Sequence, residues 1–92
     1  MTTLSDEDIE ARLQGLPDWE RAGAAITRTF TFGDFVGSVN FVNRITPAAE
    51  EMNHHPDLAI SWNTVAVTLT THSRGGLTEN DFALATQIDN LA

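Results

Sequence analysis

Residues 58–71 read LAISWNTVAVTLTT, and this stretch decides the fold. From Val65 to Leu69, valine or leucine occupies every second position, and alanine and threonine lie between them. Strict alternation of this kind predicts a β-strand with one buried face. A shorter apolar run precedes it, and Trp62 and Asn63 separate the two runs. We therefore predict a β-hairpin whose turn is formed by these two residues.

A second hairpin is predicted earlier in the chain, where residues 19–32 read WERAGAAITRTFTF. Gly23 provides a short turn between two runs that suit strands. In the second run Ile26, Phe30 and Phe32 share one parity, and threonines occupy the other. This pattern predicts a half-buried strand. Two such hairpins can join into one four-stranded antiparallel sheet.

Helices are predicted before, between and after the two hairpins. The first extends from about Ser5 to Gln14, because Ser5 and Asp8 resemble a capping box and apolar residues follow one turn apart. The last begins at Thr78 with Asp81 at the third position after it, which is again the spacing of a capping box. Its predicted core residues are Phe82, Ala85 and Ile88.

The middle helix follows Asp34, which can cap it, and it must end before Pro56. Pro47 lies inside this segment and predicts a kink or a break, because proline lacks a backbone donor and clashes with the preceding turn at a cost of about 3 kcal/mol. Apolar residues recur at near-helical spacing and predict a buried stripe: Phe35, Val39, Val42, Ala49 and Met52.

The predicted order is therefore α-β-β-α-β-β-α. It indicates an α+β fold in which a four-stranded antiparallel sheet carries three helices packed on one face. With 92 residues the chain is long enough for one domain and too short for two, so residues 1–92 form a single domain.

Composition excludes several classes of function. The formal net charge is -8, from 13 acidic and 5 basic residues, so the surface repels nucleic-acid phosphates and anionic lipids. The chain has no cysteine, which removes disulfides, thiolate metal sites and cysteine nucleophiles. No apolar run approaches the ~20 residues that span a bilayer, and the first residues do not resemble a signal peptide. We expect a cytoplasmic protein that binds neither nucleic acid nor membrane.

Three histidines are the candidates for chemistry. His54 and His55 directly precede Pro56, and His72 follows the long strand. Proline forces the residue before it into an extended conformation, which partly fixes the direction of His55. An imidazole with an ordinary pKa of about 6.5 exchanges protons at neutral pH. Two alternatives stay open: structural roles as a helix cap or a solvated strand end, and a zinc site, for which adjacent histidines are poor spacing.

Three further side chains have two interpretations each. Asp81 completes a capping box, and its carboxylate can instead orient an imidazole or hold a donor of a ligand. Glu50 lies one turn before the paired histidines, where it is either a solvated helix charge or a ligand contact. Trp62 suits packing at the edge of the core or a stacking surface for a ring.

Residues 50–85, EEMNHHPDLAISWNTVAVTLTTHSRGGLTENDFALA, resemble the signature region of the pterin-4a-carbinolamine dehydratases. That pattern has an acidic residue, the triplet His-His-Pro, an aromatic residue, a histidine and an aspartate at defined spacings. The positions that match are Glu50, His54, His55, Pro56, Trp62, His72 and Asp81. The chain departs from the common form at Trp62, where tyrosine is frequent, at Leu58, where many members have an aromatic residue, and at Pro47.

The resemblance implies an activity and a role for each site residue. Family members remove water from the 4a-hydroxytetrahydropterin that aromatic amino-acid hydroxylases release, and they yield a quinonoid dihydropterin for tetrahydrobiopterin recycling. It implies that the three histidines are the catalytic set, with His54 and His72 carrying the acid and base steps and His55 mainly holding the pterin. Asp81 would support the site by hydrogen bonding, and Glu50 and Trp62 would complete the substrate-binding set. Which imidazole is acid and which is base stays open.

The resemblance also implies a homodimer or homotetramer and no metal or organic cofactor. The alternative to an enzyme is a non-catalytic interaction or assembly module on the same fold. The two hypotheses differ in one measurable property, which is whether the protein accelerates pterin dehydration.

Overall fold

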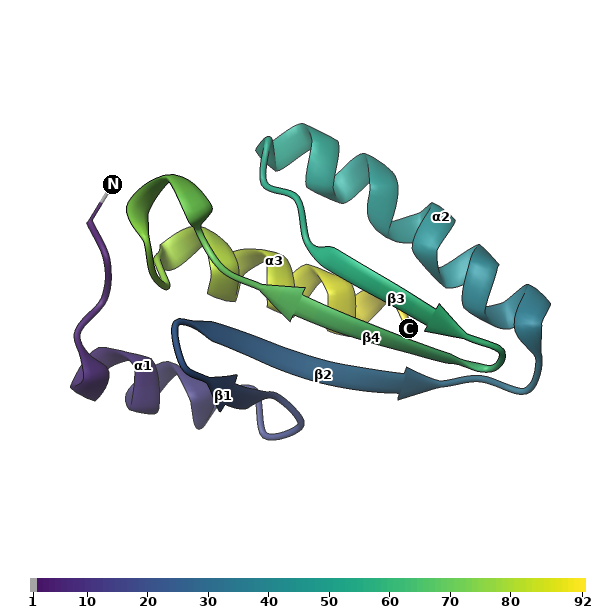
Figure 1. Cartoon of the computed structure of the whole chain (residues 1–92), viewed down its shortest axis with the longest axis horizontal. Coiled ribbons are helices and arrows are strands. Elements are labelled where there is room, and N and C mark those ends of the chain that lie inside the picture. The colour runs from purple at the N-terminus through teal and green to yellow at the C-terminus, as the bar shows by residue number, and fades with distance from the viewer. Residues whose placement is uncertain (1) are drawn as a thin grey trace.

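The computed structural model describes residues 2–92 of the chain. It confirms the α+β fold and the predicted order of helices and strands (Figure 1). The structure adds a short 3-10 helix before the last α-helix. The elements are α1 (Asp6–Leu13), β1 (Glu20–Ala22), β2 (Ala25–Thr31), α2 (Phe35–Met52), β3 (Asp57–Ser61), β4 (Thr64–Leu69), the 3-10 helix (His72–Arg74) and α3 (Glu79–Leu91).

All strands belong to one antiparallel sheet with the order β1-β2-β4-β3. The two hairpins are joined in the middle, where Ile26 of β2 pairs with Leu69 of β4. Both predicted turns are present: Gly23 has a φ of 63° in the first, and Trp62 has a φ of 49° in the second. This order leaves β3 with an unpaired edge in a single chain.

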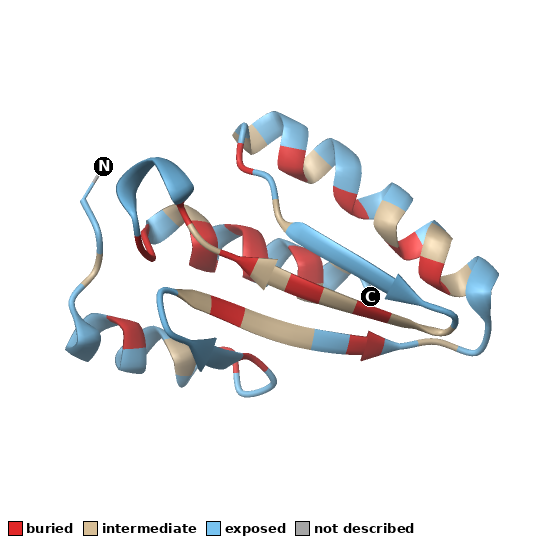
Figure 2. Ribbon diagram, in the orientation of Figure 1, coloured by how far each residue is buried: buried red, intermediate tan, exposed pale blue. Residues whose placement is uncertain are grey.

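The core lies between the sheet and the helices, as the coloring by burial shows (Figure 2). In β4 burial alternates as predicted, with Val65, Val67 and Leu69 fully enclosed. Phe30 of β2 packs against Phe41 of α2, and their ring centroids lie 4.7 Å apart. These contacts hold α2 against the sheet and thereby fix where its C-terminus lies.

The buried stripe of α2 differs from the predicted one. The buried residues of α2 are Ser38, Phe41, Ile45 and Ala49, whereas Phe35 is 54% exposed. Val42 and Met52 are only partly buried at the margin of the core. The apolar residues of this helix cover more than one face, so their spacing alone did not identify which face packs against the sheet.

Of the two predicted effects of Pro47, a break in the middle helix does not occur, because α2 continues through Pro47 to Met52. Pro47 and Asn43, whose carbonyl loses its helical donor, are both exposed. Water can therefore bind this carbonyl, and packing of Phe41, Ile45 and Ala49 holds the two halves together. None of the helices in residues 2–92 combines the length and apolar character needed to cross a bilayer.

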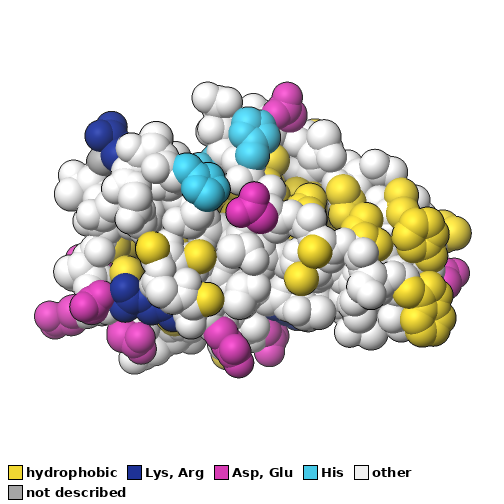
Figure 3. Space-filling view, viewed as in Figure 1, with side chains coloured by type: hydrophobic (Ala, Val, Ile, Leu, Met, Phe, Trp, Pro, Cys, Tyr) yellow, Lys and Arg dark blue, Asp and Glu magenta, His cyan; other side chains and the backbone are white. Residues whose placement is uncertain are grey.

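Large apolar side chains are exposed at the start of α2 and at the adjoining β3–β4 turn. Val36 is 62% exposed and Trp62 is 68% exposed. Ser38 donates a hydrogen bond to the carbonyl of Trp62 at 2.8 Å, which joins the helix to the turn. Figure 3 shows hydrophobic side chains gathered at this end of the molecule. We name Phe35, Val36, Ile60 and Trp62 the apolar end patch.

Candidate active site

The end of α2 directs His54 into the protein. Asn53 adopts the left-handed conformation, with φ 49° and ψ 43°. The backbone N–H of His54 then donates to the carbonyl of Ala49 at 3.0 Å, and that of Asn53 donates to Glu50 at 3.1 Å. These two bonds form a Schellman-type cap that reverses the chain direction. As a result His54 is only 8% exposed, unlike the other two histidines.

Asp81 is the buried partner of His54. Its Oδ1 lies 2.6 Å from Nε2 of His54. Its Oδ2 accepts from the backbone N–H of Thr78 at 2.9 Å and from the Thr71 hydroxyl at 2.8 Å. The carboxylate is fully enclosed. Both interpretations of Asp81 therefore hold at once: one oxygen completes the capping box of α3, and the other contacts an imidazole.

His55 projects outward beside Glu50. Pro56 keeps His55 extended, and its Nε2 lies 2.5 Å from Oε2 of Glu50, with both side chains exposed. A small hollow of about 160 Å³ adjoins them between α2 and β3, and Pro56 and Leu58 contribute to its walls. This pair of an acidic residue and an imidazole thus borders a concave surface.

His72 lies at the same end of the sheet. It opens the 3-10 helix just after β4, and its side chain is 76% exposed. Its Nε2 lies 3.8 Å from Oδ2 of Asp57, the first residue of β3. Because Asp57 is two residues after His55, the start of β3 and the end of β4 bring these histidines to one region. Figure 3 shows histidine side chains near one another on this face, next to carboxyl groups.

The arrangement provides two kinds of imidazole. His54 contacts a buried carboxylate, which restricts the orientation of its ring. His72 is free to contact a bound molecule from the solvent side. A pair of imidazoles in different environments is suited to giving one proton and taking another. Within residues 2–92 no three His, Asp or Glu side chains are arranged as metal ligands.

Comparison with known proteins identifies the family. The family model described as "Pterin 4 alpha carbinolamine dehydratase" matches residues 2–91. The chain belongs to this dehydratase family. A protein of Thermosynechococcus vestitus that is provisionally named a pterin-4-alpha-carbinolamine dehydratase is 56% identical over 97% of this chain and 94% of its own length. A relative from Nocardia farcinica with the same name is 53% identical over 100% and 99%.

Solved structures agree with the dehydratase family fold. The crystal structure of a transcriptional coactivator/pterin dehydratase from Brucella melitensis matches with a TM-score of 0.95 and 34% identity, over 99% of both chains. A pterin dehydratase-like protein identified as a RuBisCO assembly factor matches with a TM-score of 0.70 and 24% identity, over 82% of this chain and 89% of its own. The second likeness shows the fold alone.

Trp62 lies away from the histidines of this dehydratase-family chain. Asp57 and Ser61 are the two ends of β3, which places Trp62 about 13 Å or more along the strand from Asp57. Its ring is exposed in the apolar end patch. The structure therefore brings together His54, Asp81, His55 and Glu50, with His72 beside Asp57, but it does not bring Trp62 to them. A contact between Trp62 and the substrate stays a prediction, and the structure of a single chain does not support it.

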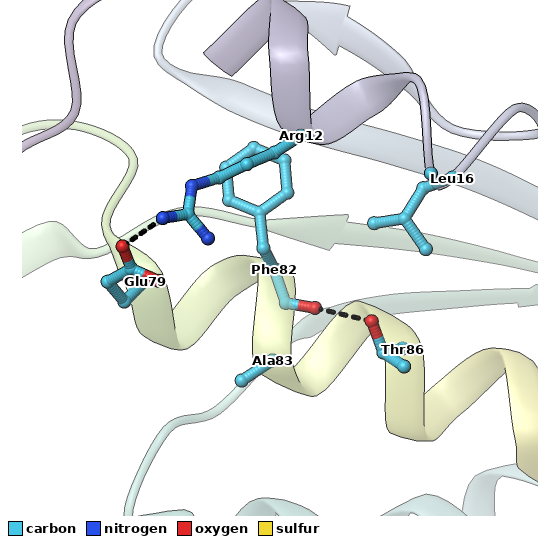
Figure 4. A pocket seen from close by; sticks show the side chains of 7 residues that line it. Arg12, Leu16, Glu79, Phe82, Ala83 and Thr86 are labelled. Carbon is cyan, nitrogen blue, oxygen red and sulfur yellow. Dashed lines mark hydrogen bonds and ion pairs between the residues drawn. The ribbon is translucent and has the colours of Figure 1, made fainter. Parts of the chain in front are cut away.

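A second hollow lies on the other side of the dehydratase fold. It has a volume of about 280 Å³ and lies between α1 and α3 (Figure 4). Leu16 and Phe82 line it, and Arg12 reaches over the Phe82 ring to pair with Glu79. None of the three histidines lines this hollow. The three histidines of the family signature therefore lie outside this hollow.

Sequence reasoning missed Thr71 and the hydroxyl of Thr78 as members of the site. Thr71 is buried and bonds both Asp81 and Thr78. A signal was present, because Thr71 continues the buried parity of Val67 and Leu69. A polar residue at a core position needs a hydrogen-bond partner, and the nearest polar group after the turn is the start of α3.

Proposed function

We propose that this protein dehydrates 4a-hydroxytetrahydropterin to quinonoid dihydropterin and water, as part of tetrahydrobiopterin recycling. The observation that carries the proposal is the 2.6 Å contact between His54 and the buried carboxylate of Asp81, at the end of the sheet that also holds His55 and His72. Membership of the dehydratase family and the names of the relatives support the substrate class.

The reaction requires two proton transfers. The C4a–O bond breaks, the leaving oxygen takes a proton and becomes water, and a ring N–H gives up a proton as the C=N bond forms. His54 and His72 carry these two transfers in our proposal. Each transfer by a positioned side chain typically contributes about 10² to 10⁴ in rate. The buried His54 and the exposed His72 meet the need for two imidazoles with different surroundings.

His55 and Glu50 are the proposed substrate-binding pair. Both side chains are exposed, and they contact each other beside the hollow between α2 and β3. A pterin ring has an N–H edge that a carboxylate can accept from and oxygen and nitrogen atoms that an imidazole can donate to. Replacing their mutual contact with contacts to the substrate lets the pair bind without leaving either group unpaired.

The test of this function is the dehydration rate of enzymatically generated 4a-hydroxytetrahydropterin, followed by ultraviolet absorbance. Wild-type protein should accelerate dehydration well above the spontaneous rate at catalytic concentrations. An equal concentration of unrelated protein of similar charge is the control. Absence of acceleration would contradict the proposal and would favour the non-catalytic assembly module, for which the fold likeness to a RuBisCO assembly factor is the only support.

A homodimer or homotetramer belongs to the proposal. The unpaired edge of β3 presents backbone donors and acceptors, and all of its residues are exposed. The apolar end patch adjoins this edge and adds apolar area that a second copy can cover. A cytoplasmic location remains a prediction from sequence.

Val36→Glu should weaken this assembly. In a symmetric interface each copy adds one carboxylate next to its mate, which should raise the dissociation constant by at least about tenfold. The fold itself should tolerate the change, because Val36 is 62% exposed and lies in the first turn of α2, where an acidic side chain is favourable. Light scattering after size exclusion measures the mass as a function of concentration.

Ala11→Glu is the matched control, since it adds the same charge to an exposed position of α1, away from the patch. If both variants and the wild type show the same mass at every concentration, the apolar end patch is not an assembly surface.

A further inference from the structure

A chain of hydroxyl groups lies behind the imidazole of His54. The Oγ1 atoms of Thr71 and Thr78 are 2.8 Å apart, and Thr71 Oγ1 lies 2.8 Å from Oδ2 of Asp81. Thr78 is fully enclosed and Thr71 nearly so. The proposed reaction does not use either hydroxyl directly, and α3 would keep its backbone cap without the Thr71 hydroxyl.

The direction of these hydrogen bonds follows from the number of protons. A carboxylate only accepts, so the single hydroxyl proton of Thr71 goes to Asp81. Thr78 must then donate its proton to the oxygen of Thr71. Oδ2 of Asp81 also accepts from the backbone N–H of Thr78, which occupies both of its acceptor directions. Only Oδ1 remains for His54.

We propose that Thr71 and Thr78 are positioning residues that select the tautomer and orientation of His54. With Oδ2 occupied, Asp81 holds its Oδ1 toward Nε2 of His54, so the neutral ring carries its proton on Nε2. Nδ1 is then the nitrogen that exchanges a proton with the substrate. The catalytic consequence of this inference rests on the proposed dehydratase function. The tautomer of His54 is independent of that function.

Loss of the Thr71 hydroxyl frees Asp81 to rotate. In Thr71→Val the shape of the side chain is kept, but Oδ2 retains only the backbone donor, and the Thr78 hydroxyl loses its acceptor. The imidazole is then no longer held to a single orientation. We expect kcat to fall by about 10- to 100-fold with KM changed by less than about threefold, because the substrate contacts of His55 are untouched.

Two further variants distinguish a positioning role of the Thr71 hydroxyl from a packing role of the side chain. Thr71→Ser restores a hydroxyl and should recover most of the lost kcat. Thr27→Val is the matched control: Thr27 is a half-buried strand threonine whose hydroxyl donates to the carbonyl of Val67 at 3.0 Å, away from the histidines. It should lose stability comparable to Thr71→Val and keep its kcat.

Nitrogen NMR of histidine-labelled protein reads the tautomer directly. At about pH 8, where an ordinary imidazole is neutral, His54 should show the Nε2–H form in wild type, Thr71→Ser and Thr27→Val. Thr71→Val should show a mixture of the two tautomers. A wild-type protein with the proton of His54 on Nδ1, or a Thr71→Val variant with unchanged tautomer and kcat, would overturn the inference. If wild type does not accelerate dehydration, the function fails, and the NMR comparison alone decides the positioning role.

Discussion

His54→Ala and His72→Ala should each lower kcat for pterin dehydration by about 10²- to 10⁴-fold, since each removes one of two proton-transfer groups. Their effects on stability should differ. His72 is 76% exposed, so its removal should leave the free energy of unfolding nearly unchanged. Removal of His54 leaves Oδ1 of Asp81 without its donor in a buried site and should cost about 1–3 kcal/mol.

The ultraviolet assay at equal enzyme concentrations measures the rates, and circular dichroism on heating verifies that each variant is folded. His55→Ala is the comparison within the same site. Because His55 is exposed and pairs with Glu50, its removal should raise KM more than it lowers kcat. Wild-type rates in both His54→Ala and His72→Ala would refute the acid-base assignment.

Asp81→Asn should damage activity and stability together. The amide has one accepting oxygen, whereas Asp81 faces donors on both sides: His54 on one, and Thr78 and Thr71 on the other. At least one buried donor loses its acceptor, which costs about 1–3 kcal/mol. We expect kcat to fall by about 10²- to 10⁴-fold, because the carboxylate that fixes the imidazole is lost.

Asp89→Asn is the control on the same helix. Asp89 accepts from Trp19 Nε1 at 2.8 Å and from Arg28 Nη1 at 2.7 Å, so its amide variant should also lose stability. It lies outside the histidine region and should keep kcat. Thermal unfolding and the dehydration assay, applied to both variants, separate the two effects. Equal kcat in Asp81→Asn and Asp89→Asn would contradict a catalytic role for Asp81.

The sequence predicted the sheet more accurately than the middle helix. Alternation from Val65 to Leu69 has a period of two, so one buried face follows without ambiguity. In α2, apolar residues cover more than one face of the helix, and Phe41 and Ile45 are buried while Phe35 is not. Which of several apolar faces meets the sheet depends on tertiary contacts, here the packing of Phe41 against Phe30.

The candidate site, like the fold, could be predicted from the sequence only in part. The spacing of the histidines and Asp81 predicted the candidate groups, but it did not predict that His54 is buried against Asp81 while His72 is exposed. That difference arises from the left-handed cap at Asn53, which turns His54 inward. Trp62 matched the family spacing along the chain, yet the hairpin carries it to the far end of β3.

Asp81 joins the end of α2 to the start of α3 through the same side chain that contacts His54. Helix ends can open locally at a lower free energy than the whole domain unfolds, and in this turn the buried side chains of Thr78, Asp81 and Phe82 oppose such opening. Each such opening would withdraw the carboxylate from the imidazole and interrupt catalysis while the sheet and core remain intact. In the proposed mechanism, activity should therefore be lost below the melting temperature of the domain if this one helical turn opens first.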